Sequence, residues 1–107
     1  GTRIAAALDA QARAAGAREL VNLASQEYFR AVSSGHLSVP VITPVFKEYR
    51  GGTLKIVSFS AKRARGAMAG FAIRHRLRRA EELKRFAEDG YRFDAALSSE
   101  REWLFVR

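Results

Sequence analysis

The chain has 107 residues, of which 48% are hydrophobic and 28% charged, and its formal net charge is +8. This length suits one domain, and the composition is far from that of a disordered chain. The absence of cysteine excludes a disulfide scaffold, a thiolate metal site and a cysteine nucleophile. Because neither a membrane-spanning apolar run nor a signal-peptide pattern is visible, we expect a soluble, cytoplasmic protein with no membrane partner.

The N-terminal third predicts two helices and one short strand. The alanine-rich residues 2–15 precede a glycine and favour a helix. Residues 20–23 are mostly apolar and predict a strand. Ser25 suits a helix N-cap and Glu27 suits the acidic first turn that follows, so we expect a second, short helix carrying Tyr28.

A β-hairpin is the clearest prediction in the chain. Its first strand, residues 39–49, is β-branched and aromatic but contains Pro40 and Pro44. Proline is poorly tolerated in a central strand, so we expect this strand at a sheet edge or with a bulge. Two consecutive glycines then turn the chain into a second strand, residues 53–59.

A long helix is expected next, over residues 61–77, with Ser60 as its N-cap. A helical wheel places apolar or small residues on two opposite faces and basic residues on the flanks between them. One face carries Ala64, Ala67, Met68, Phe71 and His75, and the other carries Gly66, Gly70, Ile73 and Leu77. We therefore expect this helix to be packed on two sides, with His75 in the core.

The remaining sequence predicts a short helix at residues 80–87 and strands at residues 91–94 and 103–106. A central hairpin and short strands with flanking helices correspond to an α/β fold of the mixed α+β kind.

Positive charge is concentrated in residues 62–85, which carry nine basic and two acidic residues. Lys62, Arg63 and Arg65 fall in the first two turns of the predicted helix, where the helix dipole disfavours cations. Such breaches of a local rule are most often found at functional sites. The free N–H groups of the helix start and these cations would form a phosphate or carboxylate receptor, which Gly66 would allow a ligand to approach closely.

Six sequence blocks occur in the order seen in the YaaA family. They are Leu23–Phe29, Pro44–Phe46, Ile56–Phe59, Ala61–Gly66 with Met68, Arg74–Leu77 and Gly90–Asp94. The chain resembles the C-terminal portion of this family. Residues 1–107 are therefore expected to be a single domain or the C-terminal fragment of a YaaA-like domain of roughly 250 residues. In the second case its partner would be the N-terminal half of the same fold.

The resemblance implies a bacterial peroxide stress response protein that binds DNA through a basic cleft and limits iron-dependent oxidative damage. The candidate DNA- or anion-binding residues are Lys62, Arg63, Arg65, Gly66, Arg74, Arg76 and Arg78. Five phosphate contacts would reduce DNA affinity by roughly 500-fold between 50 and 200 mM salt. Family members commonly carry arginine where this chain has Gly70, a loss for which Arg74 or Arg76 would compensate.

Tyr28 and Tyr91 are candidates for stacking on an unpaired base, although their spacing also suits core positions. The alternative function is that of an enzyme acting on a phosphate-bearing or nucleobase substrate bound at the Lys62–Gly66 helix start. Its catalytic candidates are Ser25 and Glu27, the latter as general base, yet helix capping alone would select both. Two distant histidines match no metal-ligand pattern, so neither a metal nor a cofactor is predicted.

Overall fold

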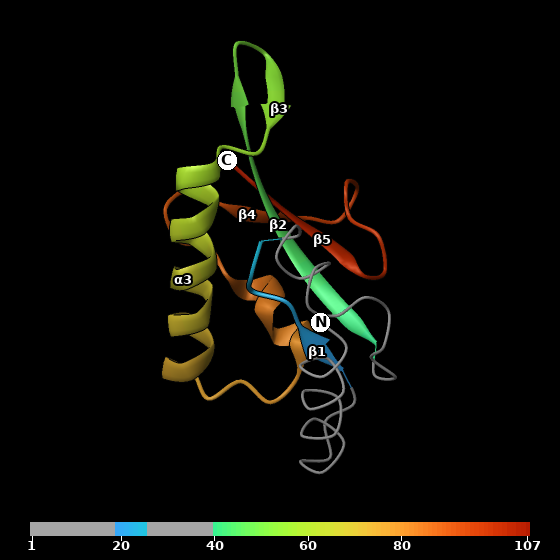
Figure 1. Cartoon of the computed structure of the whole chain (residues 1–107). Helices are drawn as coiled ribbons and strands as arrows, with labels where there is room; N and C mark the ends of the chain where they lie inside the picture. Colours follow the sequence, from blue (N-terminus) through green and yellow to red (C-terminus); the bar gives the residue numbers. More distant parts are fainter. Residues whose placement is uncertain (1–18, 26–39) are drawn as a thin grey trace.

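The computed structural model describes residues 19–25 and 40–107, which form a mixed sheet with a long helix on one face (Figure 1). The predicted helices at residues 2–15 and around Tyr28 lie outside these residues. The five strands are β1 (Leu20–Val21), β2 (Val41–Arg50), β3 (Thr53–Lys55), β4 (Arg92–Asp94) and β5 (Glu102–Val106). Their order is β1-β2-β5-β4, with β3 paired to β2, which confirms the α/β class.

Strand β2 lies in the middle of the sheet, so the prediction of an edge strand is wrong. It pairs in parallel with β1 on one side and with β5 on the other. The N–H of Thr43 donates to the carbonyl of Arg101 at 2.7 Å and therefore faces β5. Because successive residues alternate, Pro44 faces the β1 side, beyond the last β1 pair at Ile42. The proline therefore removes no hydrogen bond between β2 and β1, although it has no N–H to donate.

The hairpin turn is built by Gly51 and Gly52, whose φ angles are 59° and 78°. The tight turns that join the strands of a hairpin require positive φ angles at two consecutive residues, which glycine adopts readily. Strand β3 ends at Lys55, earlier than predicted, because the chain enters the long helix three residues later. The hairpin extends beyond the rest of the sheet (Figure 1).

Helix α3 (Ser58–Arg74) begins and ends three residues earlier than predicted. The N–H of Ala61 donates to the carbonyl of Val57 at 2.8 Å, so the helical hydrogen bonds begin there. Ser60 consequently lies inside the first turn, and the prediction that it caps the helix is wrong. Arg76, with a φ of 51°, takes the chain out of the helical direction. Within the described residues, no helix is long and apolar enough to cross a membrane.

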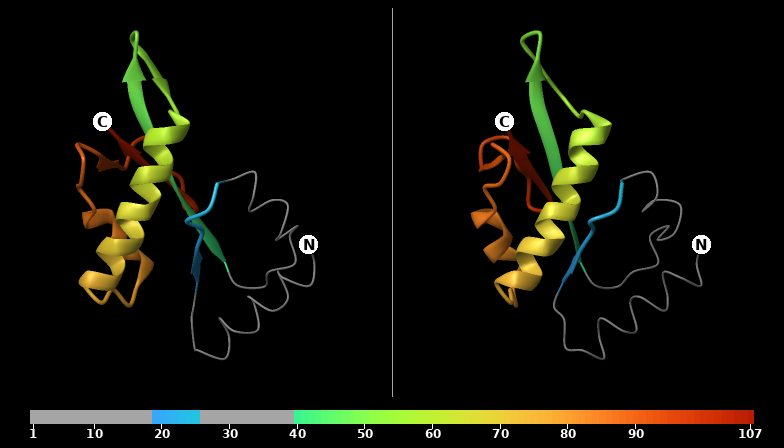
Figure 2. Two further views of the ribbon diagram at one scale, coloured as in Figure 1. Left: turned by 60° about the vertical axis from the view of Figure 1, so that its left-hand side comes forward. Right: turned by 90° about the vertical axis from the view of Figure 1, so that its left-hand side faces the viewer.

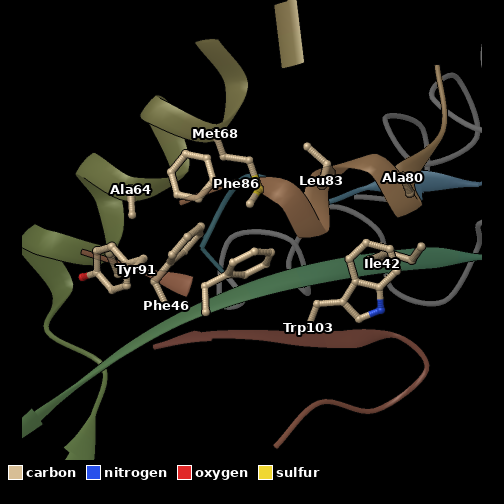
Figure 3. Packing of buried hydrophobic residues seen from close by; sticks show 11 residues of the cluster. Ile42, Phe46, Ala64, Met68, Ala80, Leu83, Phe86, Tyr91 and Trp103 are labelled. Carbon is tan, nitrogen blue, oxygen red and sulfur yellow. The ribbon is translucent and has the colours of Figure 1, made fainter. Parts of the chain in front are cut away.

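Helix α3 lies against the sheet (Figure 2), and the core packs between α3 and one face of β2 and β5 (Figure 3). Met68 of α3 is fully buried, and Phe46 of β2 stacks on Phe105 of β5 with ring centroids 5.3 Å apart. The apolar helix face predicted around Met68 is confirmed. The opposite face is covered only in part, because Leu77 packs half-buried against the core whereas Ile73 is 77% exposed.

The C-terminal elements close the core beside α3. The predicted helix at residues 80–87 is a 3-10 helix, η1 (Ala80–Arg85), which contributes Leu83 to the core. Phe86 follows it and packs edge-on against Phe46, with ring centroids 5.9 Å apart. Strands β4 and β5 agree with their predictions to within one residue.

Candidate functional site

The segment Leu23–Ser25 is directed toward α3 by a local turn at the end of β1. The N–H of Asn22 donates to the carbonyl of Ile42 at 2.8 Å, which continues the pairing with β2. The side-chain Oδ1 of Asn22 then accepts a hydrogen bond from the N–H of Ala24 at 2.9 Å. This Asx turn bends the chain away from the sheet.

Two clefts between this segment, β2 and α3 share Ala24, Ser25 and Arg65, so they adjoin, and we call them together the basic groove. The inner cleft has a volume of about 230 Å³ and is lined further by Pro44, Val45, Phe46, Ile56, Ser58 and Ala61. The outer cleft has a volume of about 570 Å³ and is lined further by Leu23, Lys62, Gly66 and Ala69. The fold thus brings Ser25 beside the predicted basic block.

The basic groove is electropositive. Arg65 is half-buried and Lys62 is exposed. Among the described residues, neither cation makes an ion pair and no acidic side chain lines either cleft. An anion in this groove would therefore meet two cations whose charge no described acid offsets, beside apolar walls that strengthen the attraction.

The conflict between the helix dipole and the cations at the start of α3 is weaker than the sequence predicted. Lys62, Arg63 and Arg65 lie in the second turn, because the helix begins at Ser58. The dipole effect falls off within the first turn, so these cations are disfavoured less than expected. Ser58 itself lines the inner cleft, and the helix start has neither a side-chain cap nor an acidic residue in its first turn.

The other predicted anion-binding arginines do not join the basic groove. The guanidinium of Arg63 lies 5.9 Å from the ring centroid of the exposed Phe59. Arg74 donates to Glu88 at 3.0 Å. Arg76 follows the end of α3, and Arg78 lines a separate cleft. The charge cluster seen in the sequence is therefore divided over several surfaces.

Tyr91 is a core residue, and the prediction that it stacks on a base is wrong. It is 1% exposed, and its ring packs edge-on against Phe46, with centroids 5.3 Å apart. The guanidinium of Arg107 lies 4.5 Å from the ring centroid. Burial raises the pKa of Tyr91. Tyr28 and Glu27 lie outside the described residues, so their roles, including that of Glu27 as a base beside Ser25, stay predictions.

His75 is exposed, which contradicts its predicted core position. It follows the last turn of α3, and its ring centroid lies 4.5 Å from that of Phe71. In the part of the chain that the structure describes, no group of three histidine or acidic side chains gathers as a metal site would require.

Two polar residues inside the fold were not singled out by the sequence analysis. Glu48 is 6% exposed and receives hydrogen bonds from Arg50 at 2.9 Å and from Arg107 at 3.2 Å. Asn22 is also 6% exposed, and among the residues that the structure describes its Nδ2 has no hydrogen-bond partner. The only sequence signal for the burial of either residue was a polar side chain within a mostly apolar predicted strand.

The chain spans less than half the length of the curated relatives it matches. It is 52% identical over 109 residues to a UPF0246 protein of Paraburkholderia xenovorans, which covers 100% of this chain and 42% of that protein. It is 47% identical over 107 residues to a UPF0246 protein of Hahella chejuensis, with the same coverage of 100% and 42%. A UPF0246 protein of Cupriavidus pinatubonensis is 56% identical over 92 residues, covering 86% of this chain and 35% of that protein.

A family model described as peroxide stress protein YaaA matches residues 1–97. This match covers both Ser25 and the basic block of α3, and it agrees with the order of sequence blocks from which the resemblance was inferred. The chain belongs to the YaaA family of peroxide stress proteins.

Proposed function

We propose that the chain binds DNA through the basic groove, with a phosphate held between Lys62 and Arg65. One observation carries this proposal. Ser25 and Arg65, which are far apart in the sequence, line both clefts of a groove whose described lining contains two cations and no acid. Phosphate groups supply most of the affinity of proteins for DNA, and unpaired cations in a groove attract them.

The shape of the groove favours a phosphate that belongs to a backbone. Gly66 is exposed and lines the outer cleft, so a sugar-phosphate chain can approach α3 closely at this point. Phosphate contacts orient a protein on DNA without reading its sequence. We therefore expect binding with little sequence preference.

We infer that DNA binding is the means by which this peroxide stress protein limits iron-dependent oxidative damage to DNA. Family membership supports a role in peroxide stress, and the basic groove supports contact with DNA. A protein bound along the backbone would reduce the access of iron and peroxide to it.

Fluorescence anisotropy tests the binding step. Labelled duplex, bulged and single-stranded DNA are titrated with the chain and with the Lys62→Glu/Arg65→Glu variant. The matched control is Arg92→Glu/Arg101→Glu, which reverses two exposed charges outside the groove. We expect the groove variant to lose binding and the control to retain most of it. Equal losses in the two variants, or no binding by the chain, would contradict the proposal.

The protective step has its own measurement. Plasmid DNA is exposed to ferrous iron and hydrogen peroxide with the chain or with either double variant, and nicking is quantified on a gel. The chain and the control variant should reduce nicking, whereas the groove variant should not. If the chain binds DNA without reducing nicking, the inferred role in protection is wrong while DNA binding stands.

A further inference from the structure

A third cleft lies between β1, the end of α3 and η1, outside the basic groove. Its volume is about 560 Å³, within the range of about 300–1,000 Å³ that is usual for small-molecule sites. It is lined by Glu19, Val21, Leu23, Ala72, Leu77, Arg78, Arg79, Ala80 and Leu83. Figure 1 shows the three elements converging at the end of α3 that is remote from the hairpin.

The lining of this cleft combines an apolar wall with a cationic rim. The wall consists of aliphatic side chains, including Val21 of β1, Leu77 of the segment between α3 and η1, and the buried Leu83 of η1. Arg78 and Arg79 are both exposed, and among the described residues neither guanidinium makes an ion pair. Two adjacent arginines of this kind suit a phosphate group, which accepts several charge-assisted hydrogen bonds.

Two carboxylates lie near the arginines, and backbone groups engage both. Oε1 of Glu19 accepts a hydrogen bond from the N–H of Ala80 at 3.2 Å. Oε2 of Glu82 accepts one from the N–H of Arg78 at 3.1 Å. A carboxylate has acceptor sites on both oxygens, so Glu19, which lines the cleft, can accept a further hydrogen bond from a ligand.

We propose that this cleft binds a purine nucleoside monophosphate, with the phosphate on Arg78 and Arg79, the base against the aliphatic wall and a base N–H donating to Glu19. The ligand is matched to three features of the lining: the two arginines suit its phosphate, the aliphatic wall suits its flat base, and Glu19 suits a base N–H. The cleft shares Leu23 with the outer cleft of the basic groove, but neither Lys62 nor Arg65 lines it, so its cations are separate from those of the proposed DNA contact.

Isothermal titration calorimetry of the chain with adenosine monophosphate tests this site. Arg78→Ala/Arg79→Ala should weaken binding by about tenfold or more, as expected for loss of charge-assisted hydrogen bonds. Ala72→Phe should abolish binding by filling the cleft, and Lys62→Glu/Arg65→Glu should leave it unchanged. Circular dichroism establishes that each variant is folded. Adenosine and inorganic phosphate, titrated separately, should each bind more weakly than the complete nucleotide.

Three results would overturn the proposal. The first is no binding of adenosine monophosphate at millimolar concentration. The second is binding that depends on Lys62 and Arg65 but not on the cleft variants, which would place the nucleotide in the basic groove. The third is equal affinity for adenosine and its monophosphate, which would remove the role assigned to Arg78 and Arg79.

Discussion

Nη2 of Arg107 lies 3.2 Å from Oε1 of Glu48 and ties the end of β5 to the middle strand of the sheet. The same guanidinium lies over the ring of Tyr91, whose hydroxyl donates to Glu48 at 3.4 Å. Glu48 is 6% exposed, so its charge depends on these contacts and on Arg50. A charged cluster is therefore part of the packing at the base of the hairpin.

This cluster predicts a loss of stability in acid. Burial alone would raise the pKa of Glu48, but hydrogen bonds from Arg50 and Arg107 hold it below its ordinary value of 4.5. A carboxyl with a lowered folded-state pKa contributes stability that is complete above the unfolded-state pKa and is lost as pH falls through the folded-state value. We expect the Tm to decrease below about pH 4.5, and to decrease less in Glu48→Gln.

Thermal unfolding followed by circular dichroism between pH 7 and pH 3 measures this difference. Glu100→Gln, at an exposed position, is the matched control and should follow the unmodified chain. If Glu48→Gln shows the same dependence on pH as the control, the ion pairs of Glu48 do not contribute to stability.

The packing of α3 on the sheet predicts contrasting effects of two substitutions in that helix. Met68 is fully buried, whereas Ile73 is 77% exposed. Met68→Ala should reduce the free energy of unfolding by about 2–5 kcal/mol, because it removes buried methylene groups and leaves a cavity. Ile73→Ala should change it by less than about 1 kcal/mol. Urea unfolding of both variants is the measurement, and similar losses would contradict the assigned helix face.

Alanine substitutions at two glycines of α3 distinguish an effect on stability from an effect on DNA binding. Apart from the backbone of its own helix and its chain neighbours, a Cβ at Gly66 would meet no described atom within 4 Å, whereas one at Gly70 would lie 2.9 Å from Nη1 of Arg74. Alanine is favoured over glycine inside a helix by roughly 0.5–1 kcal/mol, so Gly66→Ala should stabilise by that amount. Gly70→Ala should stabilise by less, since it displaces Arg74 from an exposed pair with Glu88 worth at most about 1 kcal/mol.

The same two substitutions should also differ in their effect on DNA binding, with the more stabilising one, Gly66→Ala, being the one that weakens it. Gly66 lines the basic groove, so an added methyl group there should weaken DNA binding although the protein becomes more stable. Gly70 does not line the groove, and Gly70→Ala should leave the affinity unchanged. Anisotropy titrations of both variants provide the comparison. A Gly66→Ala variant that binds as tightly as the unmodified chain would rule out close approach of the DNA backbone at this position.

The division of the basic cluster changes the expected salt dependence. The sequence analysis considered the case of five phosphate contacts, whereas the described lining of the basic groove has two basic residues, Lys62 and Arg65. Two contacts give a slope of about −1.8 in log affinity against log salt, or roughly a 12-fold loss between 50 and 200 mM. Anisotropy across a salt series measures this slope. A slope near −4.5 would show that arginines outside the groove also contact phosphates.

Local patterns in the sequence were sufficient for several elements. The Gly51–Gly52 turn, the apolar face of α3 around Met68, and strands β4 and β5 were all predicted to within a few residues. In each case the signal is a short-range periodicity or a backbone requirement of glycine, which acts without reference to the rest of the chain. The family was likewise identified from the order of short blocks.

The site depended on contacts that no local pattern encodes. The sequence indicated a basic cluster and offered Ser25 as a catalytic candidate. Only the parallel pairing of β1 with β2 placed Ser25 in the same cleft as Arg65. The same cluster was divided because the helical periodicity and the ion pair of Arg74 direct its members to different surfaces.

By itself the sequence determined the hairpin turn, the apolar face of α3 around Met68 and the family, because these follow from neighbouring residues. The tertiary structure alone decided that β2 is central, that Tyr91 and Glu48 are buried together, and that the basic groove contains two cations of the seven-residue candidate set. The physical reason is that burial and charge pairing depend on which distant segments meet, and strand pairing, rather than local propensity, sets those meetings.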